Sequence, residues 1–351
     1  MGLLFSIIAI AVLIILAIAG AAIPGLHPVF TVALPYLAIA IFIVGVIVRV
    51  LKWAKSPVPF RITTTSGQEK SLPWIKQNKL DNPSSSLGVI GRMALEVLFF
   101  RSLFRNTKAE LKEGTKIAYG ETKWLWAFGL LFHWSFLIVF LRHFRFFADP
   151  IPFFVKYLET LDGFFQIGVP IVYLTGIGLL VALTYLFLRR IFDAKVKYIS
   201  LASDYFPLLL LIAIATTGII MRYYVKTDLV AIKQVAVGIL SFHPITPAET
   251  ISPWFYIHFF LVNVLLIYFP MSKLMHMGGV FLSPTRNLAN NNRMAYHENP
   301  WINDENYFKL HRHTYEEYED EFRVLMKGAG LPLEKEVVNQ PAKDGTEKED
   351  K

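Results

Sequence analysis

The segment FHWSFLIVFLRHF, residues 132–144, is the most informative part of the sequence for predicting the fold. It is apolar enough to lie within a membrane, yet it carries Arg142 and two histidines, His133 and His143. The whole chain shares this character, since 54% of its 351 residues are hydrophobic and 18% are charged. Several apolar runs exceed the roughly 18–20 residues that a helix needs to cross a bilayer. The sequence therefore predicts an all-α, polytopic membrane protein and excludes a water-soluble one.

Six membrane-spanning helices are predicted from the apolar runs. Their ranges are 3–23, 29–51, 124–147, 164–188, 205–221 and 254–275. The first two form a hairpin, residues 1–51, because only a short connection separates them. The first run lacks a charged n-region and exceeds the apolar part of a signal peptide, so we expect a retained helix. Residues 124–278 form the core, and a bundle of four to five of the six helices is expected to hold the functional groups.

Two polar regions lie outside these helices. Residues 52–123 contain SSSLGVIGRMALEVLFFRSLFRN, residues 84–106, which predicts an amphipathic helix that lies on the membrane surface or packs under the bundle. Residues 279–351 form a polar tail with the tract HRH at 311–313. That tract resembles a metal-binding motif, but two histidines two apart on a helix face different ways, so we do not expect a metal there.

The distribution of basic residues predicts the orientation. Residues 52–123 hold 13 Lys or Arg against 6 Asp or Glu, and more basic residues follow the fourth helix. Because basic loops stay in the cytoplasm, both termini are expected there. The formal net charge of +8 is assigned to these loops, and no nucleic-acid partner is expected.

Cysteine is absent from the chain. This excludes a disulfide, a thiolate zinc site, a covalently attached c-type haem and a cysteine-ligated iron–sulfur cluster within the chain. A redox centre held by this protein would need other ligands, and histidine is the first candidate.

Four histidines belong to predicted helices: His133 and His143 to the third, His258 and His276 to the sixth. Ionisable groups at membrane depth are costly and indicate function. Eighteen residues of helix make five turns and rise about 27 Å, which would place His258 and His276 on one face. Because the two helices cross in opposite directions, His143 and His258 share the outer half, and His133 and His276 the cytoplasmic half. Two imidazoles at each depth suit two bis-histidine b haems better than a polyhedral zinc or iron site.

Cations flank these histidines. Arg142 and Arg145 adjoin His143, and Lys273 precedes His276. They would pair with haem propionates or extend to the membrane interface. Two other classes of protein stay open at this point: a transporter that uses the histidines as a proton relay, and a membrane anchor in which they form only structural hydrogen bonds.

Histidines also occur in the outer loops. His27 and His243 each precede a proline, which favours extended or turn backbone and accounts for both as loop residues. His243 is in addition a candidate for a position near the outer haem or a quinone.

The two histidine segments resemble the ligand helices of the dihaem cytochrome b subunit of respiratory nitrate reductase. The shared features are FHWSFLIVFLRH with a ten-residue histidine spacing, HFFLVNVLLIYFPMSKLMHM with an eighteen-residue spacing, and SFHP before the last helix. The resemblance covers the second to sixth helices, and the first helix is extra. Three other segments, SGQEKSLPWIKQNKLDNPSS, RMALEVLFFRSLFRNTKAEL and LSPTRNLANNNR, are similar to the cytochrome b subunits of two related complexes. One complex is linked to sulfite reduction, and the other oxidises menaquinol and contains a heterodisulfide-reductase-like subunit.

This resemblance implies a site, cofactors and partners. His143 and His258 would ligate the outer haem, and His133 and His276 the inner haem. The chain would transfer electrons between menaquinone or menaquinol and a cytoplasmic iron–sulfur, heterodisulfide-reductase-like subunit in a prokaryotic cell membrane, in a direction that the sequence leaves open. A periplasmic multihaem cytochrome c, a further iron–sulfur protein and a second membrane subunit would complete a complex of sulfur respiration. The outer-side candidates for a quinone pocket, which needs a donor beside an apolar slot, are Tyr223, Tyr224, Lys226 and His243.

Overall fold

The computed structural model describes residues 1–56, 67–111, 116–165, 171–245, 247, 250–291 and 314–334. The chain divides into two units, Met1–Ala295 and Tyr296–Lys351. Within the described residues, six helical segments are long and apolar enough to cross a membrane. Their main helices are α1 (Gly2–Ala22), α2 (Leu34–Ala54), α5 (Lys123–Arg142), α7 (Leu174–Phe192), α9 (Ala202–Tyr223) and α11 (Pro253–Tyr268). The protein is a multi-pass, all-α membrane protein, as predicted.

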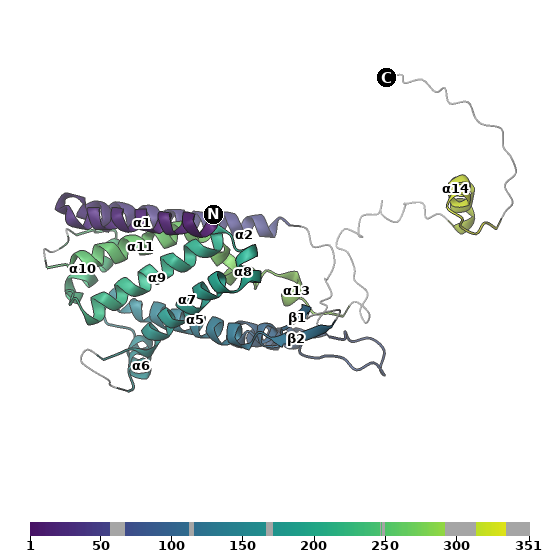
Figure 1. Ribbon diagram of the computed structural model, residues 1–351, viewed down its shortest axis with the longest axis horizontal. Coiled ribbons are helices and arrows are strands. Elements are labelled where there is room, and N and C mark those ends of the chain that lie inside the picture. The colour runs from purple at the N-terminus through teal and green to yellow at the C-terminus, as the bar shows by residue number, and fades with distance from the viewer. Residues whose placement is uncertain are drawn as a thin grey trace, which may run out of the picture. The chain divides into compact units, whose positions relative to one another are not determined.

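The helices of the first unit pack in a simple order. α5 contacts α7, α7 contacts α9, and α9 contacts α11. The α1–α2 hairpin covers the other side of α9 and α11 (Figure 1). Two short turns, η1 (Pro24–Leu26) and η2 (Val29–Ala33), connect α1 to α2. The helices that carry the four histidines therefore belong to one bundle.

The last predicted helix is broken before His276. α11 ends at Tyr268, and η4 (Phe269–Met271), η5 (Lys273–Met275) and α12 (His276–Gly279) follow. Pro270 has no amide hydrogen for a helical bond, and Ser272 is extended and caps the next turn by accepting from the Leu274 N–H at 3.1 Å. The prediction of one helix through residue 275 is wrong, and five uninterrupted helical turns do not connect His258 to His276.

The fourth predicted helix begins ten residues too early. Phe164 follows a separate short helix, α6 (Phe153–Asp162), and α7 starts at Leu174. The Asp162 carboxylate accepts from the Thr175 N–H at 2.8 Å and from its hydroxyl, which satisfies the first turn of α7. Residues 166–170 lie outside the described residues. A second helix that the sequence did not predict, α10 (Leu229–Leu240), is apolar but too short to span a membrane.

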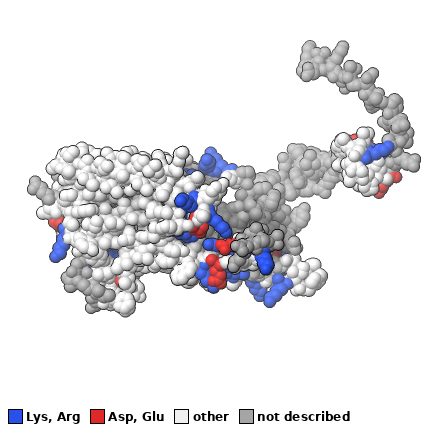
Figure 2. Space-filling model, viewed as in Figure 1, with Lys and Arg blue, Asp and Glu red and all other residues white. Residues whose placement is uncertain are grey.

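The end of the bundle at which α5 begins and α7 ends carries the polar elements. They are α3 (Ser86–Phe99), α4 (Arg101–Phe104), the antiparallel strands β1 (Thr107–Leu111) and β2 (Ile117–Glu121), α8 (Ala194–Ile199) and α13 (Pro284–Asn287). The amphipathic helix expected within residues 84–106 is confirmed as α3 and α4, whereas the small hairpin was not predicted. Figure 2 shows few charged residues over the helical band and many toward this end. We call it the charged end.

The second unit contains one described helix, α14 (Tyr315–Gly328). A capping box starts it, in which the Glu317 N–H donates to the Thr314 hydroxyl at 3.3 Å and the Thr314 N–H donates to the Glu317 carboxylate at 2.8 Å. The HRH tract at 311–313 lies outside the described residues.

Candidate functional site

The structure brings the four membrane histidines together in two pairs. The rings of His143, at the end of α5, and His258, on α11, have centroids 6.5 Å apart and planes 14° apart. The rings of His133, on α5, and His276, at the start of α12, have centroids 5.9 Å apart and planes 84° apart. In each pair one ring is half-buried and the other exposed. We call these the outer pair and the inner pair; the inner pair lies toward the charged end.

Three of the four rings hydrogen-bond to carbonyls of their own helical turn. The Nδ1 contacts are His133 with Gly129 O at 2.7 Å, His143 with Val139 O at 2.7 Å and His276 with Lys273 O at 2.8 Å. A carbonyl only accepts, so each Nδ1 donates, and Nε2 keeps its lone pair for a ligand.

The fourth ring is fixed by a neighbouring helix. His258 Nδ1 lies 2.9 Å from the hydroxyl of Thr217 on α9, and the same hydroxyl lies 2.9 Å from the carbonyls of Ala213 and Ile214. A hydroxyl that donates to one of these carbonyls can accept from the His258 Nδ1–H, an arrangement that leaves the Nε2 of His258 free as well. Gly218 leaves room for this ring, since an added Cβ there would lie only 3.3 Å from His258 Cε1. Thr217 was missed from the sequence; a hydroxyl within an apolar helix was the available signal.

The donor set fits haem. An imidazole–metal bond is about 2 Å long, and with the ring radius this places two opposed imidazole centroids roughly 6 Å apart, as in both pairs. Within the part of the chain that the structure describes, no group of three or more His, Asp or Glu residues has the arrangement of a metal site. Each pair thus offers two nitrogens and no further protein ligand, which suits the two axial positions of a haem iron.

The flanking cations each have a carboxylate partner. Arg142 pairs with Asp162 at 2.6 Å, and Lys273 pairs with Asp204 at 2.8 Å. Arg142 keeps a buried Nε without a hydrogen-bond partner among the described residues. Its guanidinium therefore retains a donor for a further anion.

Residues 88–294, which include all four histidines, match the nitrate reductase gamma subunit family. The chain belongs to this family. It is 48% identical over 279 residues, 78% of this chain and 83% of the relative, to the Hdr-like menaquinol oxidoreductase cytochrome b-like subunit of Archaeoglobus fulgidus. The protein of the same name from Archaeoglobus profundus is 44% identical over 275 residues, 77% of this chain and 81% of the relative. The predicted family resemblance is confirmed, but α1 and α2 both lie outside the matched residues, so this match does not include the second helix that the resemblance was expected to cover.

The segment between α3 and α4 contacts the inner pair of this gamma-type chain. The ring of Phe100, a residue with left-handed backbone (φ 51°), meets the edge of His133 with centroids 4.8 Å apart. Two indoles of α5 donate to the last carbonyls of α3: Trp126 to Phe99 O at 2.7 Å and Trp134 to Leu98 O at 3.1 Å. These bonds hold the charged-end segment against the inner pair.

The four candidate quinone residues do not form one cluster. Tyr223 accepts from the Tyr173 N–H at 2.9 Å, Tyr224 is 79% exposed, and His243 Nδ1 donates to Ser241 O at 2.7 Å. Among the described residues no hydrogen bond or ring contact joins any of these three, or Lys226, to the outer pair.

His27 lies in the connection between α1 and α2, as expected, but its backbone is helical and its ring makes specific contacts. Its ring stacks on Tyr256 with centroids 3.9 Å apart, and its Nε2 lies 3.0 Å from Ala21 O. Because Tyr256 is two residues before His258, this stack ties the α1–α2 hairpin to the helix of the outer pair.

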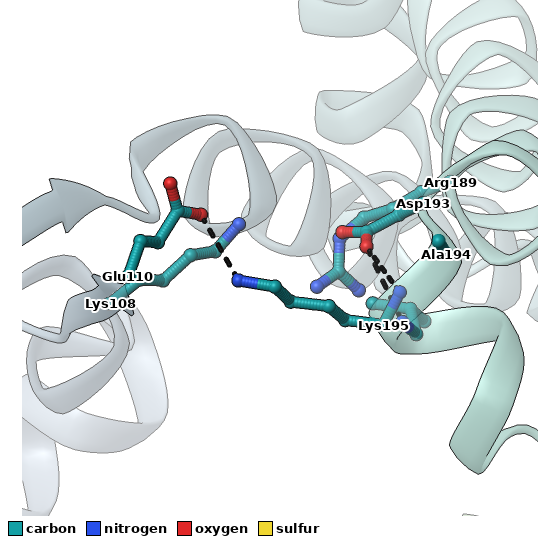
Figure 3. Close-up of a pocket in the computed structure, with 7 residues that line it drawn as sticks. Lys108, Glu110, Arg189, Asp193, Ala194 and Lys195 are labelled. Carbon is teal, nitrogen blue, oxygen red and sulfur yellow. Dashed lines mark hydrogen bonds and ion pairs between the residues drawn. The ribbon is translucent and has the colours of Figure 1, made fainter. Parts of the chain in front are cut away.

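A surface pocket at the charged end lies between β1 and the α7–α8 turn (Figure 3). It is lined by Lys108, Glu110, Arg189, Asp193, Ala194, Lys195 and Val196. Glu110 and Lys195 form an ion pair across it at 3.6 Å. None of the four histidines lines this pocket, so it is a charged surface feature apart from the candidate site.

Proposed function

We propose that this chain is the cytochrome b subunit of a menaquinol oxidoreductase complex and that its paired histidines hold two b haems. His143 and His258 would ligate the outer haem, and His133 and His276 the inner haem. Bound there, the haems would supply a path for single electrons across the membrane between menaquinol and a cytoplasmic partner.

The observation that carries the proposal is the pairing of four imidazoles with every Nδ1 engaged. Each hydrogen bond selects the tautomer that presents Nε2, and it makes the ring a stronger ligand. The carbonyl and hydroxyl partners are built into α5, α9 and the turn before α12. A proton relay would have no need to hold all four rings in this one tautomer.

The names of the two Archaeoglobus relatives, which are 48% and 44% identical to this chain over the aligned residues, support menaquinol as the electron donor. We place its oxidation at the end that carries the outer pair, with the protons released there, because that end faces outward under the positive-inside rule. Both termini are then cytoplasmic in a prokaryotic cell membrane.

The partner would carry the iron–sulfur centres, because this chain has no cysteine to hold one. We propose a cytoplasmic heterodisulfide-reductase-like subunit, docked at the charged end where the segment between α3 and α4 contacts the inner pair. A periplasmic multihaem cytochrome c, an iron–sulfur protein and a second membrane subunit would complete the assembly, in a complex linked to sulfite reduction.

The test is anaerobic mixing of the purified chain with a short-chain menaquinol analogue, followed by the visible absorbance of haem b. The wild-type chain and Thr184→Val, which loses only a helix-internal bond to Leu180 O, should be reduced quickly. His258→Ala should lose the outer haem and be reduced far more slowly, while the retained inner haem shows that it is folded. Reduction of His258→Ala at the wild-type rate would exclude a route from menaquinol through the outer pair.

A further inference from the structure

Two arginines from different helices converge on one tyrosine near the outer pair. Tyr173, just before α7, is 7% exposed. The guanidinium carbon of Arg142 lies 3.3 Å from its ring centroid, and that of Arg222 lies 4.2 Å away. We call these three side chains the arginine–tyrosine stack. Stacking holds both guanidinium planes in fixed positions.

The charges of this stack do not balance. The buried Asp162 carboxylate, 2% exposed, pairs with Arg142. Arg222 has no ion pair within the described residues, and its one hydrogen bond there is a long contact of 3.5 Å to Ile171 O. The stack therefore has two guanidinium cations and one paired carboxylate.

Hydrogen-bond donors are also left over. The Nε atoms of Arg142 and Arg222 are both buried, and neither has a partner among the described residues. Buried polar atoms of native proteins are nearly always paired, and an unpaired donor on a charged group is especially costly. Two such donors on one stack indicate that an anion completes it.

Both arginines of the stack are close along their helices, α5 and α9, to a residue of the outer pair or to one that borders it. Arg142 directly precedes His143. Arg222 is four residues beyond Gly218, whose backbone lies against His258, so the two residues share a face of α9 one turn apart. The unpaired donor of Arg142 is thus one residue from His143 along α5. The unpaired donor of Arg222 is one helical turn from Gly218 along α9.

We propose that Arg142 and Arg222, stacked on Tyr173, both bind a propionate carboxylate of the outer haem. A guanidinium fork matches the two oxygens of a carboxylate. The inference rests on the proposed function, since it requires haem at the outer pair. A cation at a propionate stabilises the reduced haem, so the loss of Arg222 lowers the potential of the outer haem.

The experiment compares Arg222→Gln with Lys156→Gln in the purified full chain, by spectroelectrochemical titration of the two b haems and by the rate of haem loss in detergent. Lys156 is an exposed cation on α6, so both variants remove one charge. Arg222→Gln should lower the potential of the outer haem alone and weaken its retention roughly 10-fold, as expected for one charge-assisted hydrogen bond. Lys156→Gln should change neither. Arg222→Lys, which keeps the charge without the fork, should preserve most of the potential but still lose haem faster; this variant decides if Arg222→Gln fails to fold.

Three results overturn the assignment. The first is an outer haem with unchanged potential and retention in Arg222→Gln, and the second is an equal shift in Lys156→Gln. The third is loss of a co-purified anionic phospholipid from Arg222→Gln with the haems unaffected, which would identify a lipid phosphate as the anion. A wild-type chain that binds no haem would instead refute the proposed function itself.

Discussion

Substitution of Thr217 is the most direct way to change the environment of His258, because the two side chains are within hydrogen-bond distance. Valine has nearly the shape of threonine, so Thr217→Val at this 7%-exposed position leaves no cavity and removes one acceptor. The Nδ1–H of His258, now 2.9 Å from a hydroxyl, would lose its partner. An unpaired buried donor costs about 2 kcal/mol, which corresponds to roughly 30-fold in an equilibrium constant. That value agrees with the 10- to 100-fold loss of affinity that follows removal of a partner behind a metal ligand.

The assay is the haem content of Thr217→Val after dilution in detergent, together with a redox titration. The outer haem should be retained roughly 30-fold less tightly, and its potential should rise, because an imidazole without its acceptor donates less charge to the iron. Thr217→Ser keeps the hydroxyl and should have the retention and the potential of the wild-type outer haem. Thr184→Val should also match the wild type. Unchanged outer-haem retention and potential in Thr217→Val would refute the assignment of this hydrogen bond to ligand orientation.

Three further predictions concern the inner pair, the charged end and α9. A side chain at Gly45 would meet Pro270, 2.6 Å from an added Cβ, so Gly45→Leu should disturb the turn before the inner pair, cost about 1–3 kcal/mol in thermal unfolding and release the inner haem first. Burial alone would raise the pKa of Asp81, but hydrogen bonds from its two arginine partners hold that pKa below its ordinary 3.8. The stabilisation that the Asp81 carboxylate gives to the charged end is therefore present above about pH 4 and is lost as the pH falls through the folded pKa. Protease cleavage of the charged end should accordingly increase in acid, and Asp81→Asn should remove this dependence on pH. Gly218→Ala should press on His258 and change the electron paramagnetic resonance signal of the outer haem, without effect on the inner one.

The membrane helices and the histidine pairs were accessible from the sequence because both depend on local pattern. Long apolar runs have few alternatives, and an imidazole within such a run stands out against its neighbours. The depths of His143 and His258 follow from helix direction and rise alone, and the structure brings these rings together. The depth of His276 was predicted from a continuous helix, which Pro270 interrupts. The pairing of His276 with His133 was therefore predicted correctly, although the helix geometry was not.

The remaining parts of the site depend on contacts between distant segments. Thr217 and His258 are 41 residues apart, and Tyr173 meets two arginines from two other helices. No periodicity within one helix encodes such contacts. The short helices α6 and α10 were missed because an apolar run below the length of a membrane span predicts neither a loop nor a helix by itself.

The binding of two b haems by these histidines is measured by a reduced-minus-oxidised visible spectrum together with a pyridine haemochrome count. We expect two b haems per wild-type chain and one in His143→Ala, with the inner haem retained. If the chain, purified with its partners from haem-replete cells, contains no haem, the histidines do not bind haem and a transport function is favoured.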